Sequence, residues 1–216
     1  MFTEMLNFKM PKTDYKYKFA FLFDQLTPLY DLARVLGIRN RLQRRLWPQV
    51  TIKSGSRVLD VGCGTGDDLI YLATHFKGLS LTGVDGDPKV LSMAKNKAKK
   101  LGLKIKFQVS LAERLPFKKH AFDVVWSSLM IHHLPTSIKL KALKEMRRVL
   151  KPAGRLYLID FDLIKNPIIR NFYWLQTLLE PVGDHFAGKL PEYLRAAGFK
   201  RWARTSLLFH VSLFKN

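Results

Sequence analysis

The chain has very little cysteine, since Cys63 is the only one among its 216 residues. One cysteine excludes an internal disulfide and a zinc site built from several thiolates, and it is typical of a reducing compartment. Long apolar runs are missing too: no stretch reaches the roughly 20 apolar residues of a membrane-spanning helix. Residues 1–19 show no uninterrupted apolar segment of the kind that a secretory leader carries. We therefore expect a cytoplasmic protein.

Acidic residues are also scarce. Asp and Glu total 17 against 37 Lys and Arg, which gives a formal net charge of +20. Such a field attracts nucleic acid, anionic lipid or acidic substrates. The same excess also arises from a lysine-rich surface without a specific partner, so the charge alone leaves the partner open.

What the chain does contain is a regular alternation of short apolar runs and longer amphipathic stretches. The apolar runs predict strands over residues 57–62, 79–87, 104–110, 122–130 and 155–161. The amphipathic stretches between them predict helices over 67–76, 88–102 and 137–154, the last of which is expected to stop at Pro152 and Gly154. Alternating strands and helices predict an α/β fold of the Rossmann-like, doubly wound type, in which both faces of a mostly parallel sheet are covered.

Two regions lie outside this alternation. Residues 1–50 are expected to form a helical extension, or lid, ahead of a domain that spans 51–216. A second helical stretch at 163–188 is rich in aromatic residues and is expected to cover the site together with the lid. The final run, over 202–215, predicts one or two edge strands, and two would complete a seven-stranded sheet.

The stretch "RVLDVGCGTGDD" carries the most chemistry. Gly62, Gly64 and Gly66 follow the first predicted strand, where a glycine turn lets a ligand approach the backbone closely. Asp85 ends the second predicted strand, where a carboxylate can bond both hydroxyls of a ribose. The sequence therefore predicts a nucleoside site at the carboxyl edge of the sheet.

The spacing of this turn limits the choice of ligand. Dinucleotide turns read G-x-G-x-x-G and offer a helix N-terminus to a pyrophosphate, whereas this turn reads G-x-G-x-G and is followed by Asp67 and Asp68. Two acids there would repel a phosphate, and at least one is expected to cap the helix. A cationic nucleoside such as S-adenosylmethionine suits the turn better. Asp60 then lies where it would meet the ammonium group, unless it only caps its strand.

The successive motifs "VLDVGCGTGDD", "LTGVDGDPKVLSMAK", "LAERLPFKKHAFDVVWSSLMIHHL" and "LKEMRRVLKPAGRLYLID" resemble those of class I S-adenosylmethionine-dependent methyltransferases. They follow one another in order over about residues 57–160. The stretch "LYDLARVLGIRNRLQRRLW" ahead of them is similar to the ubiquinone/menaquinone C-methyltransferases, with bacterial phospholipid N-methyltransferases as a second match. The resemblance implies that S-adenosylmethionine is the cofactor and S-adenosylhomocysteine the by-product.

The resemblance also implies a set of cofactor contacts. The glycine turn would line the methionine and ribose, the second strand would hold the ribose, and the next two strand ends would flank the adenine and the underside of the cofactor. These positions are Asp60, Gly62, Cys63, Gly64, Thr65, Gly66, Asp85, Gly86, Leu111, Ala112 and Ser128. Leu111 departs from the family, which commonly has Asp or Asn there to bond the adenine amino group. The adenine contact is therefore expected to be mainly apolar, unless a backbone group or Glu113 replaces the missing bond.

Few residues are expected to do chemistry directly, because a sulfonium already activates its methyl group. A base is needed only if the acceptor loses a proton. The candidates for catalysis are Tyr30, as a lid residue, together with His133 and Asp160; Asp31 and Asp162 also face the predicted mouth. His132 and His133 are expected to point different ways, so we predict no metal site.

The acceptor is the least determined part of the prediction. A basic, aromatic-rich lid favours a small or lipid-like acceptor, such as a phospholipid head group or a quinone precursor, methylated by a protein peripheral to the inner face of an anionic membrane. The alternative is an RNA-binding protein or RNA methyltransferase with the same cofactor fold, which the charge of +20 supports. No Asn/Asp-Pro-Pro-aromatic motif and no cysteine nucleophile follow the fourth predicted strand, which disfavours transfer to a base.

Overall fold

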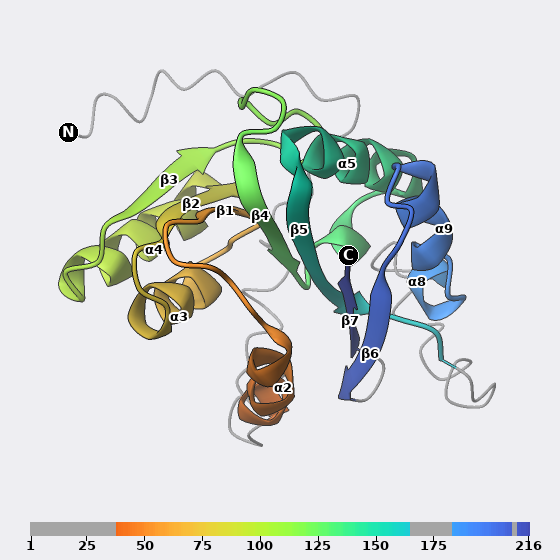
Figure 1. The fold of residues 1–216 in the computed structure, drawn as a ribbon, viewed down its shortest axis with the longest axis horizontal. Helices are drawn as coiled ribbons and strands as arrows, with labels where there is room; N and C mark the ends of the chain where they lie inside the picture. Colours follow the sequence, from red (N-terminus) through yellow and green to blue (C-terminus); the bar gives the residue numbers. More distant parts are fainter. Residues whose placement is uncertain (1–37, 165–182, 209–210) are drawn as a thin grey trace.

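The computed structural model describes residues 38–164, 183–208 and 211–216, and its centre is one sheet with the strand order β3-β2-β1-β4-β5-β7-β6 (Figure 1). The strands are β1 (Arg57–Val61), β2 (Ser80–Asp85), β3 (Ile105–Val109), β4 (Phe122–Ser128), β5 (Leu150–Phe161), β6 (Ala203–Leu208) and β7 (Val211–Lys215). Strands β1 to β5 are parallel, and β7 runs antiparallel to both β5 and β6. The prediction of a mostly parallel, seven-stranded sheet is confirmed.

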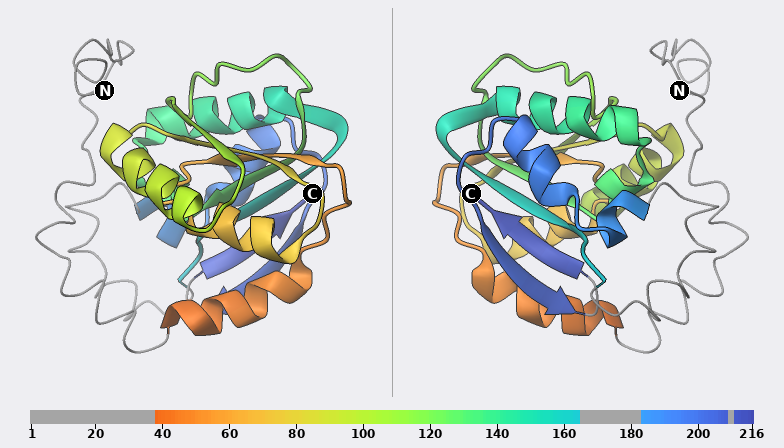
Figure 2. Two further views of the ribbon diagram at one scale, coloured as in Figure 1. Left: turned by 90° about the vertical axis from the view of Figure 1, so that its left-hand side faces the viewer. Right: turned by 90° about the vertical axis from the view of Figure 1, so that its right-hand side faces the viewer.

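Helices cover both faces of this sheet (Figure 2). The elements are α2 (Ile38–Leu46), α3 (Asp67–His75), α4 (Pro88–Lys100), α5 (Thr136–Val149), α8 (Gly183–Phe186) and α9 (Leu190–Ala196), with the 3-10 turns η2 (Trp47–Gln49) and η3 (Ile131–His133). Residues of α2, α3 and α4 share one apolar cluster with one face of the sheet, and residues of α5 and α9 share a second cluster with the other face. The protein is therefore a three-layered α/β structure of the doubly wound type.

The central strands supply apolar side chains to both clusters. In β4, Val125 belongs to the cluster under α5, whereas its neighbours Val124 and Trp126 belong to the cluster under α3. Successive side chains of a strand point to opposite faces, so a strand buried on both sides must be apolar almost throughout. This is why the apolar runs of the sequence predicted strands correctly.

The boundary between α5 and β5 differs from the prediction. The helix ends at Val149 and the strand begins at Leu150, so Pro152 and Gly154 lie within β5. Pairing between β4 and β5 shifts register, because Phe122 faces Leu150 whereas Val124 faces Arg155. Such a bulge accommodates a proline without a broken ladder hydrogen bond. The leucine and methionine spacing of α5 continues to Leu150 and concealed this boundary.

The two ends of the chain agree with the prediction in part. Both strands predicted near the C-terminus are present, but only β6 is an edge strand, since β7 lies between β5 and β6. Of the extension predicted over 1–50, the described part contains the helical elements α2 and η2, while residues 1–37 lie outside the described part. The same holds for 165–182, most of the predicted insertion. No helix among the described residues is long and apolar enough to cross a membrane.

The segment ahead of β1 is attached to the sheet by specific contacts. The ring of Trp47 stacks on that of Tyr71 in α3, with 3.8 Å between the ring centroids and 8° between the planes. Arg45 donates a hydrogen bond of 2.8 Å to the carbonyl of Leu207 in β6. The C-terminal part of α2 therefore packs on the same unit as the sheet.

Candidate functional site

The carboxyl ends of β1, β2, β4 and β5 meet at one edge of the sheet. The chain moves outward from β1 to β2 and β3, then returns to place β4 on the other side of β1, which makes the β1/β4 gap a topological switch point. Ligands of open α/β sheets bind beyond such a point. The strand ends there carry Asp60, Asp85, Ser128 and Asp160, so the structure brings these four predicted residues to one edge.

The glycine turn after β1 has a backbone that other residues rarely adopt. The φ angles of Gly62, Gly64 and Gly66 are +75°, +51° and +77°. A Cβ atom on Gly62 would lie 2.1 Å from Cγ of Met130, whereas one on Gly64 would meet no protein atom within 4 Å. The first glycine is therefore required for packing, and the second faces open space in which a ligand can approach the backbone.

Cys63, inside this turn, is buried. Burial, followed by the charges of Asp60 and Asp85, raises the pKa of the Cys63 thiol, so the side chain stays protonated. A cysteine there packs as a small apolar residue and is not a nucleophile.

Asp85, at the end of β2, is held by backbone donors. Its Oδ2 accepts a hydrogen bond of 2.9 Å from the N–H of Gly64, and its Oδ1 accepts one of 2.9 Å from the N–H of Asp87. Each carboxylate oxygen has a second lone pair, so both can still accept a bond from a ligand hydroxyl. This geometry suits the predicted contact with a ribose.

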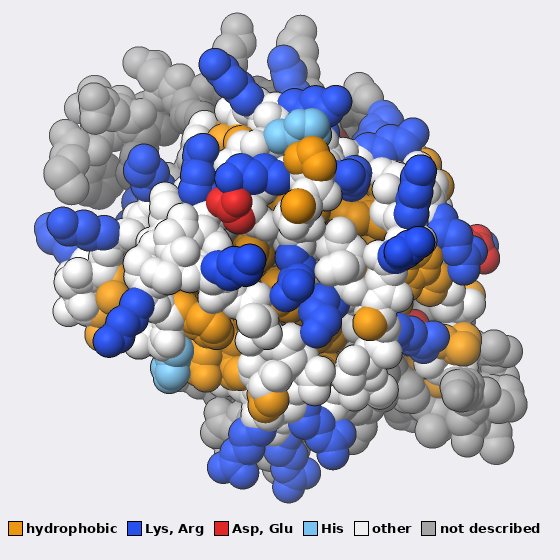
Figure 3. Space-filling model, viewed as in Figure 1, with side chains coloured by type: hydrophobic (Ala, Val, Ile, Leu, Met, Phe, Trp, Pro, Cys, Tyr) orange, Lys and Arg blue, Asp and Glu red, His pale blue; other side chains and the backbone are white. Residues whose placement is uncertain are grey.

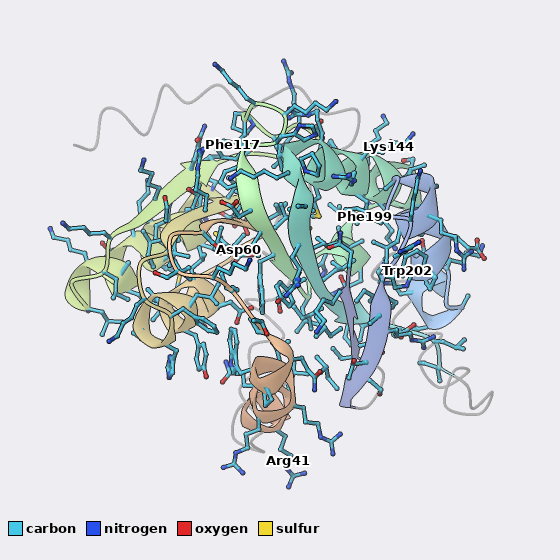
Figure 4. The ribbon with its side chains drawn as sticks, viewed as in Figure 1. Arg41, Asp60, Phe117, Lys144, Phe199 and Trp202 are labelled. Carbon is cyan, nitrogen blue, oxygen red and sulfur yellow. The ribbon has the colours of Figure 1, made fainter. Side chains whose placement is uncertain are left out.

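Asp60, near the end of β1, is buried but incompletely bonded. Its side chain is labelled at the centre of the molecule in Figure 4, and its Oδ1 has no hydrogen-bond partner. Burial raises the pKa of Asp60 well above its usual value, and the nearby carboxylates Asp68 and Asp85 raise it further. An unbonded oxygen among three carboxylates is costly unless a cationic ligand adds hydrogen bonds and positive charge. The ammonium and sulfonium of S-adenosylmethionine fit this requirement.

The two acids that open α3 do not cap it as expected. The N-cap is Gly66, which has no side chain to accept a hydrogen bond. Asp67 instead forms an ion pair with Lys97 of α4, at 2.8 Å, and Asp68 accepts a hydrogen bond of 3.0 Å from the indole N–H of Trp126. A glycine N-cap in the left-handed region directs these carboxylates to tertiary partners, which the local sequence could not indicate.

The predicted adenine side is apolar. Leu111 and Ala112 are buried just beyond the end of β3, with 7% and 5% of their surfaces exposed, and Gly86 is buried after β2. The N–H of Ser110 donates to the carbonyl of Asp85, which ties this segment to the ribose side. The arrangement agrees with an apolar contact in place of the acid–adenine bond, and the individual contacts remain predictions.

The backbone is strained directly after β4. Ser128 is half-buried at the strand end, and Leu129 has a φ of +51° although it is not glycine. Its N–H donates to the carbonyl of Ile159, which holds the strained residue in place. A positive φ at a residue other than glycine costs conformational energy, and such residues cluster at binding sites. The turn carries Met130 over Gly62 and leads to His132.

His132 and Asp160 form a buried dyad at the end of β5. Nδ1 of His132 lies 2.6 Å from Oδ1 of Asp160, and both side chains are almost fully buried. Burial alone would raise the pKa of Asp160, but His132, His185 and the N–H of Phe161 outweigh it and lower that pKa to about 2. An ionised Asp160 fixes the proton on Nδ1, which leaves the lone pair of Nε2 for a proton from elsewhere.

This dyad changes the roles expected for the catalytic candidates. Asp160 has a pKa too low to act as a base near neutral pH, and its oxygens already bond to protein groups, so it positions His132. His133 is exposed, and its ring lies 3.9 Å from that of His132, whereas the two rings were expected to point apart. The helical turn η3 brings them together. Tyr30 and Asp31 lie outside the described residues.

His185 is a further residue of this cluster that the sequence did not indicate. It is fully buried, its Nδ1 lies 3.1 Å from the carbonyl oxygen of Phe161, and its Nε2 has no hydrogen-bond partner. Burial lowers its pKa, so the ring is neutral. Asp162 is also buried and forms an ion pair of 2.5 Å with Arg204. Only the "HH" of 132–133 was a signal in the sequence, because His185 lies far along the chain.

No group of three or more His, Cys, Asp or Glu side chains is placed to hold a metal ion within the described ranges. The dyad and the three carboxylates around the glycine turn, Asp60, Asp68 and Asp85, are two separate clusters. In the dyad, Asp160 is hydrogen-bonded to groups of the protein. In the cluster of three carboxylates, Oδ1 of Asp60 has no hydrogen-bond partner.

Comparison with known proteins agrees with this geometry. Residues 58–154 match a family model described as a methyltransferase domain. The chain is 33% identical over 205 residues to the ubiquinone/menaquinone biosynthesis C-methyltransferase UbiE of Rickettsia rickettsii, covering 87% of this chain and 80% of that protein. It is 35% identical over 129 residues to a 27-O-demethylrifamycin SV methyltransferase of Amycolatopsis mediterranei, a match that spans 59% of this chain and 46% of that relative. A SAM-dependent methyltransferase from Aquifex aeolicus shares the fold, with a TM-score of 0.67 and 24% identity over 89% of this chain and 96% of that one.

Proposed function

The chain belongs to the class I S-adenosylmethionine-dependent methyltransferases, and we propose that it methylates a small acceptor of the phenol or quinol type, at an oxygen or at a ring carbon activated by it. The enzyme class and the cofactor follow from the family. The acceptor is inferred from the dyad of His132 and Asp160.

The charges and backbone donors of the cofactor site suit a cationic nucleoside. When bound, S-adenosylmethionine supplies an activated methyl group and leaves as S-adenosylhomocysteine. Asp85 would hold the ribose hydroxyls, Asp60 the ammonium, and the backbone at Gly64 the methionine part. Because Asp60 lies next to Asp68 and Asp85, the positive charge of the ligand relieves their mutual repulsion.

The dyad is the observation that carries the choice of acceptor. A base is useful in methyl transfer only where the acceptor loses a proton, as a phenol or quinol does. Asp160 holds the Nδ1 proton of His132, so Nε2 can take the proton from an acceptor hydroxyl. The resulting oxyanion can be methylated at its oxygen or at an adjacent ring carbon, and in the second case the methylated carbon then loses its own proton to restore the aromatic ring.

The names of two relatives agree with methyl transfer to carbon or to oxygen of a small molecule, and one of them concerns quinone biosynthesis. The name of one places its methyl group on carbon in ubiquinone and menaquinone biosynthesis, and the name of the other places it on an oxygen of a rifamycin. A quinone precursor with an apolar tail would be reached from a membrane surface, so the proposal includes a cytoplasmic location peripheral to the inner face of the membrane. A phospholipid amine and RNA are the other acceptors to be tested.

The direct test is a transfer assay with methyl-labelled S-adenosylmethionine against separate quinone, phospholipid and RNA fractions of the host. We expect label in a hydroxylated aromatic product, and mass spectrometry would identify the methylated atom. Label confined to RNA or to phospholipid amines would overturn the proposal. The matched variants His132→Gln and His133→Gln distinguish a base in the dyad from a general effect of the paired histidines.

A further inference from the structure

The exposed face of α4 carries charge of one sign. Between Pro88 and Ala112 the chain has seven lysines and neither Asp nor Glu. Lys97 pairs with Asp67 of α3. The other six are exposed, and they are Lys89, Lys95, Lys99, Lys100, Lys104 and Lys106. Figure 3 shows basic side chains over the part of the molecule that holds α4 and also over the rest of the visible face.

The same surface exposes large apolar side chains. Met93 and Leu101 have 53% and 58% of their surfaces exposed, and they are two of the three exposed large hydrophobic residues among the described residues. Helix α4 buries Leu91, Ala94 and Ala98 against the sheet. Met93 lies on the opposite side of the helix, so it contributes nothing to the core.

Lys106 alternates with Ile105 and Phe107 of β3, which pack on the α4 side of the sheet, so Lys106 points to the opposite face. We propose that the exposed face of α4, made of Lys89, Lys95, Lys99 and Lys100 with Met93 and Leu101, docks onto an anionic phospholipid surface. Lysines extend their charged ends toward lipid phosphates while their stems lie along apolar surface. Exposed Met and Leu side chains between them can enter the interfacial region of the bilayer. Neither feature alone indicates a membrane. Together they match a bilayer surface, because the lysines suit the anionic head groups and the apolar side chains suit the boundary with the acyl chains.

Nucleic acid is the other polyanion that such a face could bind, and two observations disfavour it. All seven cations between Pro88 and Ala112 are lysines, whereas arginine is preferred for phosphate and base recognition. Phe107 is the sole aromatic residue of this stretch and packs into the core, so the face offers no ring for base stacking.

Protection of an edge strand is a simpler reason for some of the lysines. Natural sheets place lysine on edge strands to prevent pairing with another chain, which accounts for Lys106 and its neighbour Lys104. It does not account for the lysines of α4 or for Met93 and Leu101, because a helix surface presents no unpaired strand edge.

Vesicle binding of the full chain tests this proposal without any methyl transfer. Its result is therefore independent of the acceptor proposed above. The protein would be sedimented with vesicles of phosphatidylcholine alone or with added phosphatidylglycerol. We expect binding only to the anionic vesicles, and weaker binding as salt increases. Equal binding to both vesicles, or to neither, would overturn the proposal.

Matched variants locate the docking face. Lys95→Gln, Lys99→Gln and Lys100→Gln together should weaken vesicle binding about a hundredfold, at roughly fivefold per lysine. Exposed lysines beyond this face provide the control, in which Lys144→Gln, Lys189→Gln and Lys200→Gln together should change binding far less. Equal losses in the two triple variants would mean that net charge alone binds the lipid, and the face would be wrong.

The apolar part is tested with Met93→Ser and Leu101→Ser combined. Both side chains are exposed, so the melting temperature should stay the same while vesicle binding falls, including at high salt. A homopolymer RNA serves as the competing polyanion. If RNA binds more tightly than the anionic vesicles and binding does not respond to the double serine variant, the face recognises nucleic acid and the membrane proposal is overturned.

Discussion

Asp60 and Asp160 are both buried aspartates on neighbouring parts of one sheet edge, yet their surroundings are opposite. Asp60 has an oxygen without a hydrogen-bond partner and lies near two other carboxylates, whereas Asp160 bonds to His132 and to backbone N–H groups. The pKa of Asp60 is raised, first by burial, and the pKa of Asp160 is lowered to about 2. Burial by itself therefore does not decide the role of a carboxylate. A missing partner prepares Asp60 for a cationic ligand, while a complete set of partners lets Asp160 direct a histidine.

The largest effect is expected from a variant that disrupts the dyad of His132 and Asp160. His132→Gln should lower kcat about a thousandfold, because a positioned base contributes on the order of 10² to 10⁴. Affinity for S-adenosylhomocysteine, measured by calorimetry, should stay the same. His133→Gln is the matched control and should retain most of the activity. If the two variants lose the same activity, the dyad has no special role.

Removal of a buried charge next to this cluster should mainly affect stability. Nζ of Lys139 is fully buried and pairs with Asp184, which also accepts a hydrogen bond of 2.9 Å from Tyr193. Lys139→Met should cost about 3 kcal/mol of unfolding free energy, because it leaves Asp184 without its cation. Chemical denaturation measures this cost, and adding Asp184→Asn should recover part of it. A double variant as unstable as the sum of the singles would show that the pair is not coupled.

Asp60→Asn tests whether the unpaired carboxylate of Asp60 binds the cofactor. It should weaken binding of S-adenosylmethionine about thirtyfold, because a buried charge pair with a ligand contributes roughly 2 kcal/mol or more. The same variant should stabilise the protein without ligand, because an unbonded buried charge is removed. Calorimetry and thermal unfolding would check the two signs. Loss of both stability and binding would mean that Asp60 is only a structural cap.

The two aspartates should also differ in how stability responds to pH. The stabilising effect of Asp160 is complete above its ordinary pKa of 3.8 and is lost as pH falls toward 2, since its folded-state pKa is lowered. Asp60 has a raised pKa, so its destabilising effect is complete above that value and is relieved as pH falls through it. Asp160→Asn should therefore lose about 2 kcal/mol at neutral pH, whereas Asp60→Asn should gain stability. Denaturant titrations at several pH values should show both differences shrinking in acid; a difference that grows there would contradict the assignment.

The smallest expected effect comes from Lys97. Its ion pair with Asp67 is 2.8 Å long, but the two side chains are 40% and 33% exposed. Exposed pairs contribute about 0.2 to 1 kcal/mol, so Lys97→Gln should change the unfolding free energy by no more than that. A larger loss would show that the pair holds α3 and α4 together.

Much of the fold and of the cofactor side could be predicted from the sequence. Strand β4 could be predicted because Val124, Val125 and Trp126 are all apolar, as a strand buried on both faces requires. The glycine turn could be predicted because its residues are contiguous. The roles of Asp67 and Asp68 could not be predicted, since their partners Lys97 and Trp126 are 30 and 58 residues away. The bulge that places Pro152 in β5 depends on pairing with β4, which no local pattern reports.

The acceptor side was harder to predict for the same physical reason. His132 and Asp160 are 28 residues apart, and His185 reaches the carbonyl of Phe161 only after the chain returns through α8. The sequence by itself determined the strands, the glycine turn and the polar residues near the ends of β1, β2, β4 and β5, because backbone conformation and side-chain alternation are local properties. Tertiary structure alone decided which aspartate stays unpaired and which one pairs with a histidine, because charge and burial depend on neighbours that the chain brings together only by folding.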